Sequence, residues 1–373
     1  MDYQVHFVKN NKDLKAFIRL PYWLYKHIND KTWVPPLLIE EKKKYSKTNP
    51  SLTHCDYQFF LLLKNGKPVG RICAFIHRHA VKQWKTPVGF FGSYECLDDR
   101  EGSKRLLGEV RKWLRDRDMI CMRGPWDFDT KEYGFVVKGY DQQPMMMAPY
   151  NPPYYNDQME AFGLKKVKDL LAYELDLTDG YHLPSRFLKL TDRIAKRNRI
   201  NIRSINMKKL ENDVNILLKV ANVSTYSNWG YVEVTDAEAS AIAQSMKHIA
   251  DPDIVMIAEI DSKPIGYLIA LPDINILIKK MNGRLLPFGF IQLLIGRKNI
   301  RQYRIWALGI IPGYQRRAID TLFYRRLYEI IIPKNPQRLE ANYVLENNLA
   351  MSNPIQKLGF KESKRYRVYE MSI

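Results

Sequence analysis

Apolar and polar positions alternate along the chain in a pattern that predicts the same order of elements in both halves. Two β-rich runs fold back at short polar turns, Asn65-Gly66 and Asp261-Ser262, and turns of this kind predict β-hairpins. Each hairpin is followed by a segment with apolar residues at helical spacing. These residues are Leu106, Leu107, Val110, Trp113 and Leu114 in the first half, and Ile319, Leu322, Phe323, Leu327 and Ile330 in the second. Both halves therefore predict an α/β (α+β) fold.

Similar segments recur at one fixed separation. Residues 61–75 resemble residues 257–271, and residues 161–175 resemble residues 357–371, a separation of 196 positions in both cases. Two matches at the same separation indicate two copies of one fold. We expect a domain boundary near residues 178–184, with one domain over 1–178 and the other over 179–373. Each should hold a mixed, mostly antiparallel central sheet flanked by helices.

The net charge of the chain indicates which kinds of partner it can bind. The 373 residues include 59 Lys and Arg against 40 Asp and Glu, which gives a formal charge of +19. A balance this basic predicts an acidic partner, such as nucleic acid, anionic lipid or a phosphate-bearing carrier.

The cysteines and the N-terminus bear on the cellular compartment. The four cysteines include no Cys-x-x-Cys pair, which favours reduced core thiols in a cytoplasmic protein. No basic leader precedes an apolar run, so no secretory signal is expected. The longest nearly apolar stretch, residues 285–295, is shorter than the ~20 residues that cross a bilayer. We expect a cytoplasmic protein, peripheral on the inner membrane surface at most.

One stretch of the second copy has the pattern of an anion site. Residues 304–311 read as a strand, Pro312-Gly313-Tyr314 as a turn, and the next residues open an amphipathic helix. A helix N-terminus offers free backbone N–H groups and a positive dipole end, which suit a phosphate. Arg316 and Arg317 would add charge-assisted contacts. An ordinary strand-to-helix turn with two solvated arginines fits the same pattern.

This stretch resembles the acyl-CoA pyrophosphate loop of the GCN5-related N-acetyltransferase (GNAT) superfamily, whose pattern is Gln/Arg-x-x-Gly-x-Gly/Ala. Residues 348–360, NLAMSNPIQKLGF, are similar to the superfamily's next helix. The resemblance implies two tandem GNAT-like domains and an acyl thioester as co-substrate. The residues implied to bind it are Gly309, Ile310, Ile311, Gln315, Arg316, Arg317, Ala318, Ile319 and Asn348.

Two residues depart from the superfamily pattern. Asp320 stands where a second small residue is expected, which brings a carboxylate toward the phosphates. Ile355 replaces the tyrosine that often protonates the leaving thiolate, and Tyr343 or Tyr366 is a substitute candidate. The equivalent stretch of the first copy, residues 95–103, carries four carboxylates, which would repel a pyrophosphate. We therefore expect the first copy to be degenerate and to lack nucleotide binding.

A closer resemblance covers almost the whole chain. The strings RGPWDFDT, APYNPPYY, SNWGYVEVT, LPDINILIKKMNGRLLPFG, LGIIPGYQRRAID, VLENN and KRYRVYE resemble those of the bacterial ceramide-synthase-like group of tandem acetyltransferase folds, which includes putative N-acetyltransferases. This resemblance implies transfer of a fatty acyl chain from a thioester, on CoA or on an acidic acyl carrier protein, to the amino group of a sphingoid base.

An apolar insert supports a lipid substrate independently. Residues 274–300 separate the second hairpin from the phosphate-site strand and combine apolar residues with Lys and Arg. Such a segment suits the surface of an anionic bilayer or the wall of a tunnel for a long chain. Packing of the insert on the neighbouring copy as ordinary core is the alternative.

Amide formation needs a neutral amine, and so a group that takes its proton. Glu340 is the first candidate for this general base and Glu346 the second, although either carboxylate could instead be a cap or salt-bridge partner. Backbone N–H groups near Gly309 to Ile311 would stabilise the oxyanion, as the superfamily resemblance implies. The candidate contacts for the acceptor are Trp229, Asp273, Asn275, Phe288 and Tyr343. No metal is expected, because His77-x-His79 has no evident third ligand.

Three functions remain open from the sequence. The leading hypothesis is an N-acyltransferase that transfers a long acyl chain to a primary amine. A non-catalytic acyl-thioester or lipid-binding protein would explain Asp320, Ile355 and the degenerate first copy. An aminoacyl-tRNA-dependent transferase would suit the basic charge, although nucleic acid is the least favoured partner.

Overall fold

The computed structural model describes residues 2–128, 133–246, 249–285, 287 and 289–373. The chain forms two compact units. The N-terminal unit comprises Met1–Asp169, Leu277–Ile291 and Lys364–Ile373, and the C-terminal unit comprises Leu170–Ile276 and Gln292–Ser363. Each unit is a mixed sheet with helices on its faces, as the repeated pattern predicted.

The sheet of the N-terminal unit is mostly antiparallel. Its order is β1 (Tyr3–Phe7), β2 (Cys55–Lys64), β3 (Lys67–His77), β4 (Val88–Cys96), β5 (Cys121–Gly124) and β13 (Lys361–Ser372), with β6 (Phe135–Lys138) also paired to β13. Only the β4–β5 pair among these is parallel. The predicted hairpin is confirmed, because Asn65 and Gly66 adopt positive φ between β2 and β3, as a tight type I′ turn requires.

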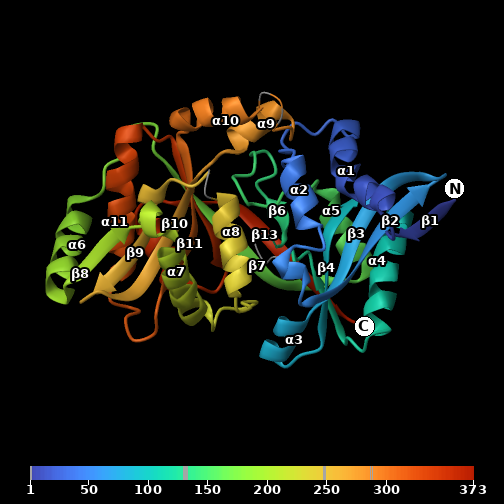
Figure 1. Ribbon diagram of the computed structural model, residues 1–373, viewed down its shortest axis with the longest axis horizontal. Coiled ribbons are helices and arrows are strands. Elements are labelled where there is room, and N and C mark those ends of the chain that lie inside the picture. Colours follow the sequence, from blue (N-terminus) through green and yellow to red (C-terminus); the bar gives the residue numbers. More distant parts are fainter. Residues whose placement is uncertain (1, 129–132, 247–248, 286, 288) are drawn as a thin grey trace. The chain divides into compact units, whose positions relative to one another are not determined.

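Helices cover both faces of this sheet. They are α1 (Asn11–His27), α2 (Leu38–Lys44), α3 (Arg78–Trp84), α4 (Arg100–Arg115) and α5 (Tyr154–Phe162), with a short 3-10 turn η1 (Pro50–Leu52). The predicted apolar stripe of α4 is buried, and Leu106 and Leu107 pack in one core with Ile72 of β3. Arg71, which precedes Ile72 in β3, points to the opposite face of the sheet. Its guanidinium lies there over the ring of Phe17 in α1. Figure 1 shows α4 along its sheet.

The C-terminal unit repeats this arrangement. Its sheet order is β7 (Lys165–Asp176), β12 (Arg338–Leu345), β11 (Gln302–Ile310), β10 (Lys263–Pro272), β9 (Val255–Ile260) and β8 (Ile200–Ser204). The β11–β12 pair is parallel and its described neighbours are antiparallel. The second predicted hairpin is also confirmed, with Asp261 and Ser262 at positive φ between β9 and β10.

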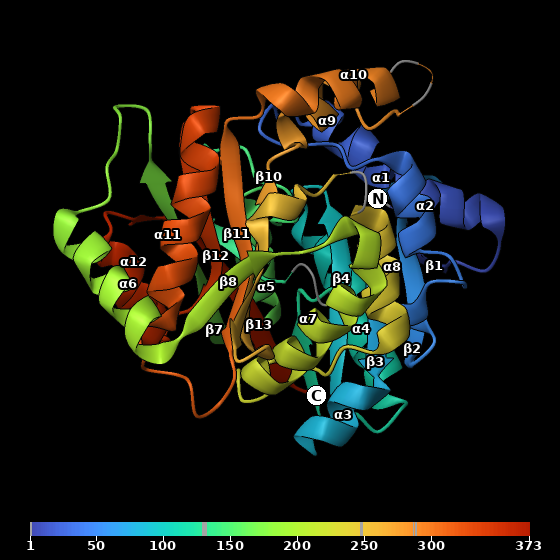
Figure 2. The ribbon, with the colours of Figure 1, turned by 60° about the vertical axis from the view of Figure 1, so that its left-hand side comes forward.

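Helices again lie on two faces. The unit contains α6 (Ser185–Asn198), α7 (Leu210–Thr225), α8 (Asp236–Met246), α11 (Ile319–Ile331) and α12 (Leu349–Lys357), with the 3-10 turns η2 (Met207–Lys209), η3 (Pro252–Ile254) and η5 (Ile332–Lys334). Leu268 of β10 shares a core with α6, α11 and α12, while Gly309 of β11 faces Ser224 of α7. Figure 2 shows α6, α11 and α12 together, with α7 and α8 across the strands.

The insert predicted over 274–300 contains α9 (Asn275–Met281), α10 (Gly289–Gly296) and the 3-10 turn η4 (Arg297–Asn299). Its first part packs as core: Ile274, Ile278 and Met281 are buried. After α9, the carbonyl of Gly283 accepts a hydrogen bond from the N–H of Leu38 at 3.0 Å. The helix α10 is different, because most of its apolar side chains are exposed.

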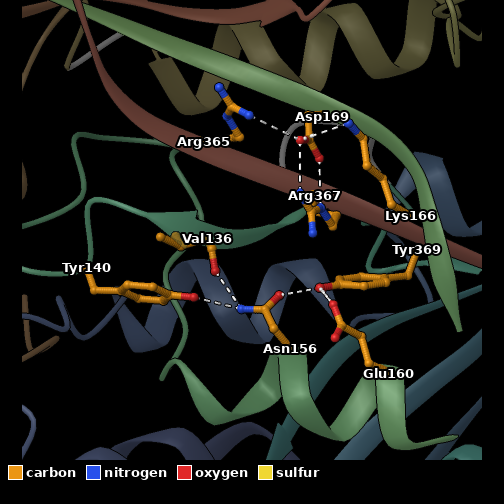
Figure 3. Close-up of polar contacts among 9 residues, drawn as sticks. All are labelled: Val136, Tyr140, Asn156, Glu160, Lys166, Asp169, Arg365, Arg367 and Tyr369. Carbon is orange, nitrogen blue, oxygen red and sulfur yellow. Dashed lines mark hydrogen bonds and ion pairs between the residues drawn. The ribbon is translucent and has the colours of Figure 1, made fainter. Parts of the chain in front are cut away.

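The last strand of each sequence copy pairs with strands that lie in the other half of the sequence. The segment of β7 from Leu170 pairs with β12, and the end of β13 pairs with β5. Beside this crossing point, Asp169 is fully buried and accepts two hydrogen bonds from Arg367, at 2.9 and 3.2 Å. Lys166 lies 3.1 Å and Arg365 3.7 Å from the same carboxylate (Figure 3). Arg367 and Lys166 hold the pKa of Asp169 below its usual value despite burial.

Candidate active site

The parallel strands β11 and β12 part in the middle of the C-terminal unit. Their pairing runs from Gln302 and Arg338 to Ile305 and Ala341, yet both strands continue, β11 to Ile310 and β12 to Leu345. The edge of β11 that faces β12 therefore has no ladder partner beyond Ile305 among the described residues. Backbone groups at this edge can bind an extended polar ligand.

Alternation along β11 decides which backbone N–H groups face the gap. Ile311 donates its N–H to the carbonyl of Ile265, toward β10. Because successive residues of a strand point their N–H groups to opposite sides, Gly309 also points toward β10 and Ile310 points toward the β12 side. Of the three predicted oxyanion donors, Gly309, Ile310 and Ile311, the geometry favours Ile310.

The loop after β11 places the predicted phosphate-binding residues at the start of α11. Gly313, Arg316 and Ala318 all have positive φ, and α11 begins at Ile319 with no side-chain cap from Ala318. The Gln315 amide donates to the carbonyl of Ile310 at 3.0 Å, which ties the loop to β11. The predicted residues Gln315 to Ile319 therefore lie together around one helix N-terminus. The side chains of Arg316 and Arg317 are exposed there.

Asp320 is the second residue of α11. Burial raises the pKa of its carboxyl, and hydrogen bonds from the backbone N–H groups of Asp320 and Thr321 oppose the shift. Those N–H groups belong to the first turn of α11, where an anionic ligand would be bound. The carboxyl of Asp320 therefore lies beside N–H groups that we expect an anionic ligand to use.

A buried polar cluster lies where β11 and β12 begin to part. Arg304 and Glu340 are neighbours in the parallel ladder, both have 0% exposure, and Arg304 Nε lies 3.6 Å from Glu340 Oε1. Asn342 donates its amide to the same oxygen at 3.4 Å. The other oxygen, Oε2, has no hydrogen-bond partner within the described part of the chain. A buried carboxylate oxygen of this kind can bind a water molecule or a substrate proton.

The remaining catalytic and thioester candidates follow β12. Tyr343 lies beside the cluster, with the Arg304 guanidinium 5.4 Å from its ring centre. Glu346 is half-buried. Asn348 is the N-cap of α12, and its side chain accepts from the N–H of Met351 at 3.2 Å. Ile355 is fully buried in the core, so no acid is present at that position.

The acceptor candidates lie on separate loops. Trp229 follows α7 and is half-buried. Asp273 is buried between β10 and α9, where its carboxylate accepts from the N–H of Asn275 at 3.2 Å. This hydrogen bond gives Asp273 a turn-stabilising role. Phe288 lies outside the described residues.

The sequence analysis missed one titratable residue in the N-terminal unit. Glu95 lies at the position of β4 that corresponds to Gly309 of β11, since the next residues, Cys96 and Ile310, pair with Gly70 and Gly266. Burial raises the pKa of Glu95 to about 7, against the lowering effect of Arg71. The Tyr155 hydroxyl donates to Glu95 at 2.8 Å. The sequence offers one signal for this position: the apolar Tyr94 and Cys96 on either side, both buried, place Glu95 on the opposite face of β4.

The start of α4 in the same unit differs from that of α11. Asp99 is its N-cap, and its side chain accepts from the N–H of Gly102 at 3.0 Å. Lys64 lies 3.3 Å from the same carboxylate. This helix N-terminus is therefore capped by its own chain. The absence of a phosphate site from the first copy stays a prediction.

Comparison with known proteins finds full-length relatives, although no protein-family model matches the chain. Protein YghO of Escherichia coli is 33% identical over 371 residues, covering 98% of this chain and 94% of its own length. The bacterial ceramide synthase of Caulobacter vibrioides is 31% identical over 384 residues, covering 100% and 98%.

Solved structures with a similar fold include GCN5-related N-acetyltransferases. The tandem GNAT protein from the clavulanic acid biosynthesis pathway has a TM-score of 0.56 at 12% identity, covering 100% of this chain and 98% of that chain. A GCN5-related N-acetyltransferase from Sphaerobacter thermophilus also has a TM-score of 0.56, at 11% identity, covering 99% and 95%. At these identities the likeness concerns the fold alone.

Proposed function

The chain belongs to the tandem-GNAT acyltransferase family of the Caulobacter bacterial ceramide synthase and YghO, and from this premise we propose that it transfers a long acyl chain from a thioester to the amino group of a sphingoid base. The observation that carries this proposal is the full-length similarity to the ceramide synthase. The gap between β11 and β12 and the loop before α11 support it. They place in one unit an open strand edge for the thioester arm and a helix N-terminus for its phosphates.

In this proposal the thioester lies along the free edge of β11. Its phosphates lie at the start of α11 near Arg316 and Arg317, and the N–H of Ile310 stabilises the oxyanion as the amine attacks. Glu340 takes the amine proton directly or through one water molecule on Oε2. The donor is an acyl-CoA or the phosphopantetheine thioester of an acidic acyl carrier protein, whose charge complements the +19 of this chain.

Turnover tests the proposal directly. The full-length protein is incubated with palmitoyl-CoA and sphinganine, and free thiol and N-acylated product are measured over time. Stoichiometric appearance of both is the expected result. Release of thiol without amide would show hydrolysis, and transfer to a short amine in place of sphinganine would place the acceptor in another class.

Asp320 offers a test of the phosphate site. We expect Asp320→Ala to bind CoA about tenfold more tightly, because it removes a negative charge from the helix start, and Arg316→Glu to bind it more weakly. For the unmodified protein, affinity should rise as pH falls through the raised pKa of Asp320, since the neutral carboxyl no longer repels phosphate. Titration calorimetry with CoA at several pH values measures both effects.

The control for Asp320→Ala is Asp236→Ala, which removes an exposed carboxylate from the first turn of α8 in the same unit. It should leave CoA affinity unchanged. Equal affinities for Asp320→Ala and the unmodified protein would place the phosphates away from α11.

We propose further that α10 binds the surface of an anionic membrane, where a lipid acceptor would be found. Phe290, Ile291, Leu294 and Ile295 are exposed on one helical face, while Leu293 is buried. The exposed Arg297 and Lys298 follow directly, and this combination of apolar and basic groups suits anionic head groups. In the described part of the chain, no helix is both long and apolar enough to cross a bilayer.

Vesicle sedimentation tests this contact. The protein should sediment with vesicles of equal parts phosphatidylcholine and phosphatidylglycerol, less with phosphatidylcholine alone, and less at high salt. The double variant Ile291→Asp/Ile295→Asp should lose about tenfold or more in partitioning, because each isoleucine contributes roughly 1.5–3 kcal/mol when buried. Ile120→Asp, at another exposed isoleucine, is the control. Identical binding by both variants would exclude α10.

A further inference from the structure

Three buried side chains with metal-binding atoms meet at one end of the β2–β3 hairpin, in the N-terminal unit. They are His54, Cys55 and His77, and one ligand atom from each lies within 4.8 Å of the others. Their exposed fractions are 8%, 6% and 4%. We call these three residues the His-Cys-His cluster. None of them has a role in the acyl transfer proposed for the C-terminal unit.

The backbone brings the three residues together. Cys55 begins β2 and pairs directly with His77 at the end of β3, so their side chains emerge side by side on one face of the hairpin. His54 precedes Cys55, and its carbonyl accepts from the N–H of Arg78 at 3.0 Å. The rings of His54 and His77 lie 4.6 Å apart. The pairing of β2 with β3 and the hydrogen bond from Arg78 to His54 therefore hold the three residues in place, which favours a preformed binding site.

We propose that the His-Cys-His cluster binds one divalent transition-metal ion of the zinc class. One thiolate and two imidazoles form a donor set that zinc prefers, at about 2.3 Å for sulfur and about 2.0–2.1 Å for nitrogen. The ligand atoms need to move inward only by about 1 Å to reach tetrahedral spacing. The fourth position is filled by water or by His79, an exposed residue whose ring stacks on His54 at 4.5 Å.

Binding exchanges two hydrogen bonds for metal–ligand bonds. The Cys55 thiol donates to the carbonyl of Ser51 at 3.2 Å, and it must release its proton to solvent to bind as thiolate. Nδ1 of His77 accepts from the N–H of Ala80 at 3.2 Å, and this bond is lost whichever ring nitrogen binds the metal. The ion then joins the start of β2 to the end of β3 and to α3. With His79 as the fourth ligand the site would be closed by protein groups, as structural zinc sites are.

Cobalt titration tests the site through its thiolate. Full-length protein freed of metal with a chelator is titrated with Co²⁺, and we expect a sulfur-to-cobalt charge-transfer band that saturates at one equivalent and disappears on addition of Zn²⁺. Cys55→Ser should abolish this band and weaken Zn²⁺ binding by at least about tenfold. Cys121→Ser, at a partly exposed cysteine of β5, is the control and should keep the band.

Thermal unfolding gives a second readout that does not require a folded Cys55 variant. Zn²⁺ should raise the melting temperature of the unmodified protein in a concentration-dependent way, and His54→Gln should reduce this shift. Absence of the charge-transfer band in the unmodified protein, or an equal band in Cys55→Ser, would overturn the proposal. So would a melting temperature that does not respond to Zn²⁺.

Discussion

Replacing Glu340 with glutamine is expected to lower kcat for acyl transfer by about 10²–10⁴-fold, the contribution typical of a positioned general base. The change keeps the size of the side chain and the hydrogen bond from Asn342, but the amide cannot accept the ammonium proton. Thioester binding should be unchanged, because the phosphate site at α11 is formed by other residues. Steady-state kinetics with palmitoyl-CoA and sphinganine measure the first effect, and CoA calorimetry measures the second.

Two further variants make this result specific. Glu340→Asp should recover part of the rate, since it restores a carboxylate at the same strand position. Glu346→Gln, at the half-buried second candidate, should remain active. Loss of activity in Glu346→Gln with full activity in Glu340→Gln would assign the base to Glu346 instead.

Local patterns predicted the elements of the fold well. The turns at Asn65-Gly66 and Asp261-Ser262 were identified because both require backbone conformations that few residues adopt readily. The stripes of α4 and α11 followed from helical spacing. All five predicted residues of α4 are buried, and so are those of α11 except Ile330, which is half-buried while Ile331 takes the core position. The comparisons confirm the GNAT resemblance that the loop after residue 311 first indicated.

Long-range pairing could not be read in the same way. The ends of β7 and β13 have similar sequences, and nothing in either strand specifies that each pairs with a strand from the other half of the chain. The His-Cys-His cluster was missed for a different reason: the predicted hairpin at Asn65-Gly66 already brings Cys55 close to His77, but only His77 and His79 were considered as metal ligands. His54 and Cys55 are brought beside His77 by antiparallel pairing across more than twenty residues.

The sequence pattern did not predict which charged residues are buried. Arg304 is the first residue of the predicted strand 304–311, and nothing in the sequence pattern indicated that it is fully buried beside Glu340. Glu95 was counted only as one of four carboxylates that would repel a phosphate, and its side chain is largely enclosed beside Arg71. Each of these residues is tolerated only because its partner lies on a neighbouring strand, and that partner is set by register rather than by local sequence.

Replacing Arg304 with methionine is expected to destabilise the C-terminal unit by about 3–5 kcal/mol, the range for breaking a buried ion pair from one side. The substitution leaves the carboxylate of Glu340 buried without its cation, while methionine fills much of the same volume. Urea unfolding followed by tryptophan fluorescence measures the loss as a lower midpoint. An unchanged midpoint would mean that Glu340 does not depend on Arg304 for its charge balance.

The double variant Arg304→Met/Glu340→Leu separates the structural role of the pair from its catalytic role. Replacing both charges by apolar groups of similar size is often neutral or stabilising, so this variant should recover most of the stability lost in Arg304→Met. It has no carboxylate at position 340 and should therefore remain inactive although it is folded. Recovery of both stability and acyl transfer would show that the ion pair serves the fold alone, and the proton acceptor would then have to be sought at Glu346 or in water.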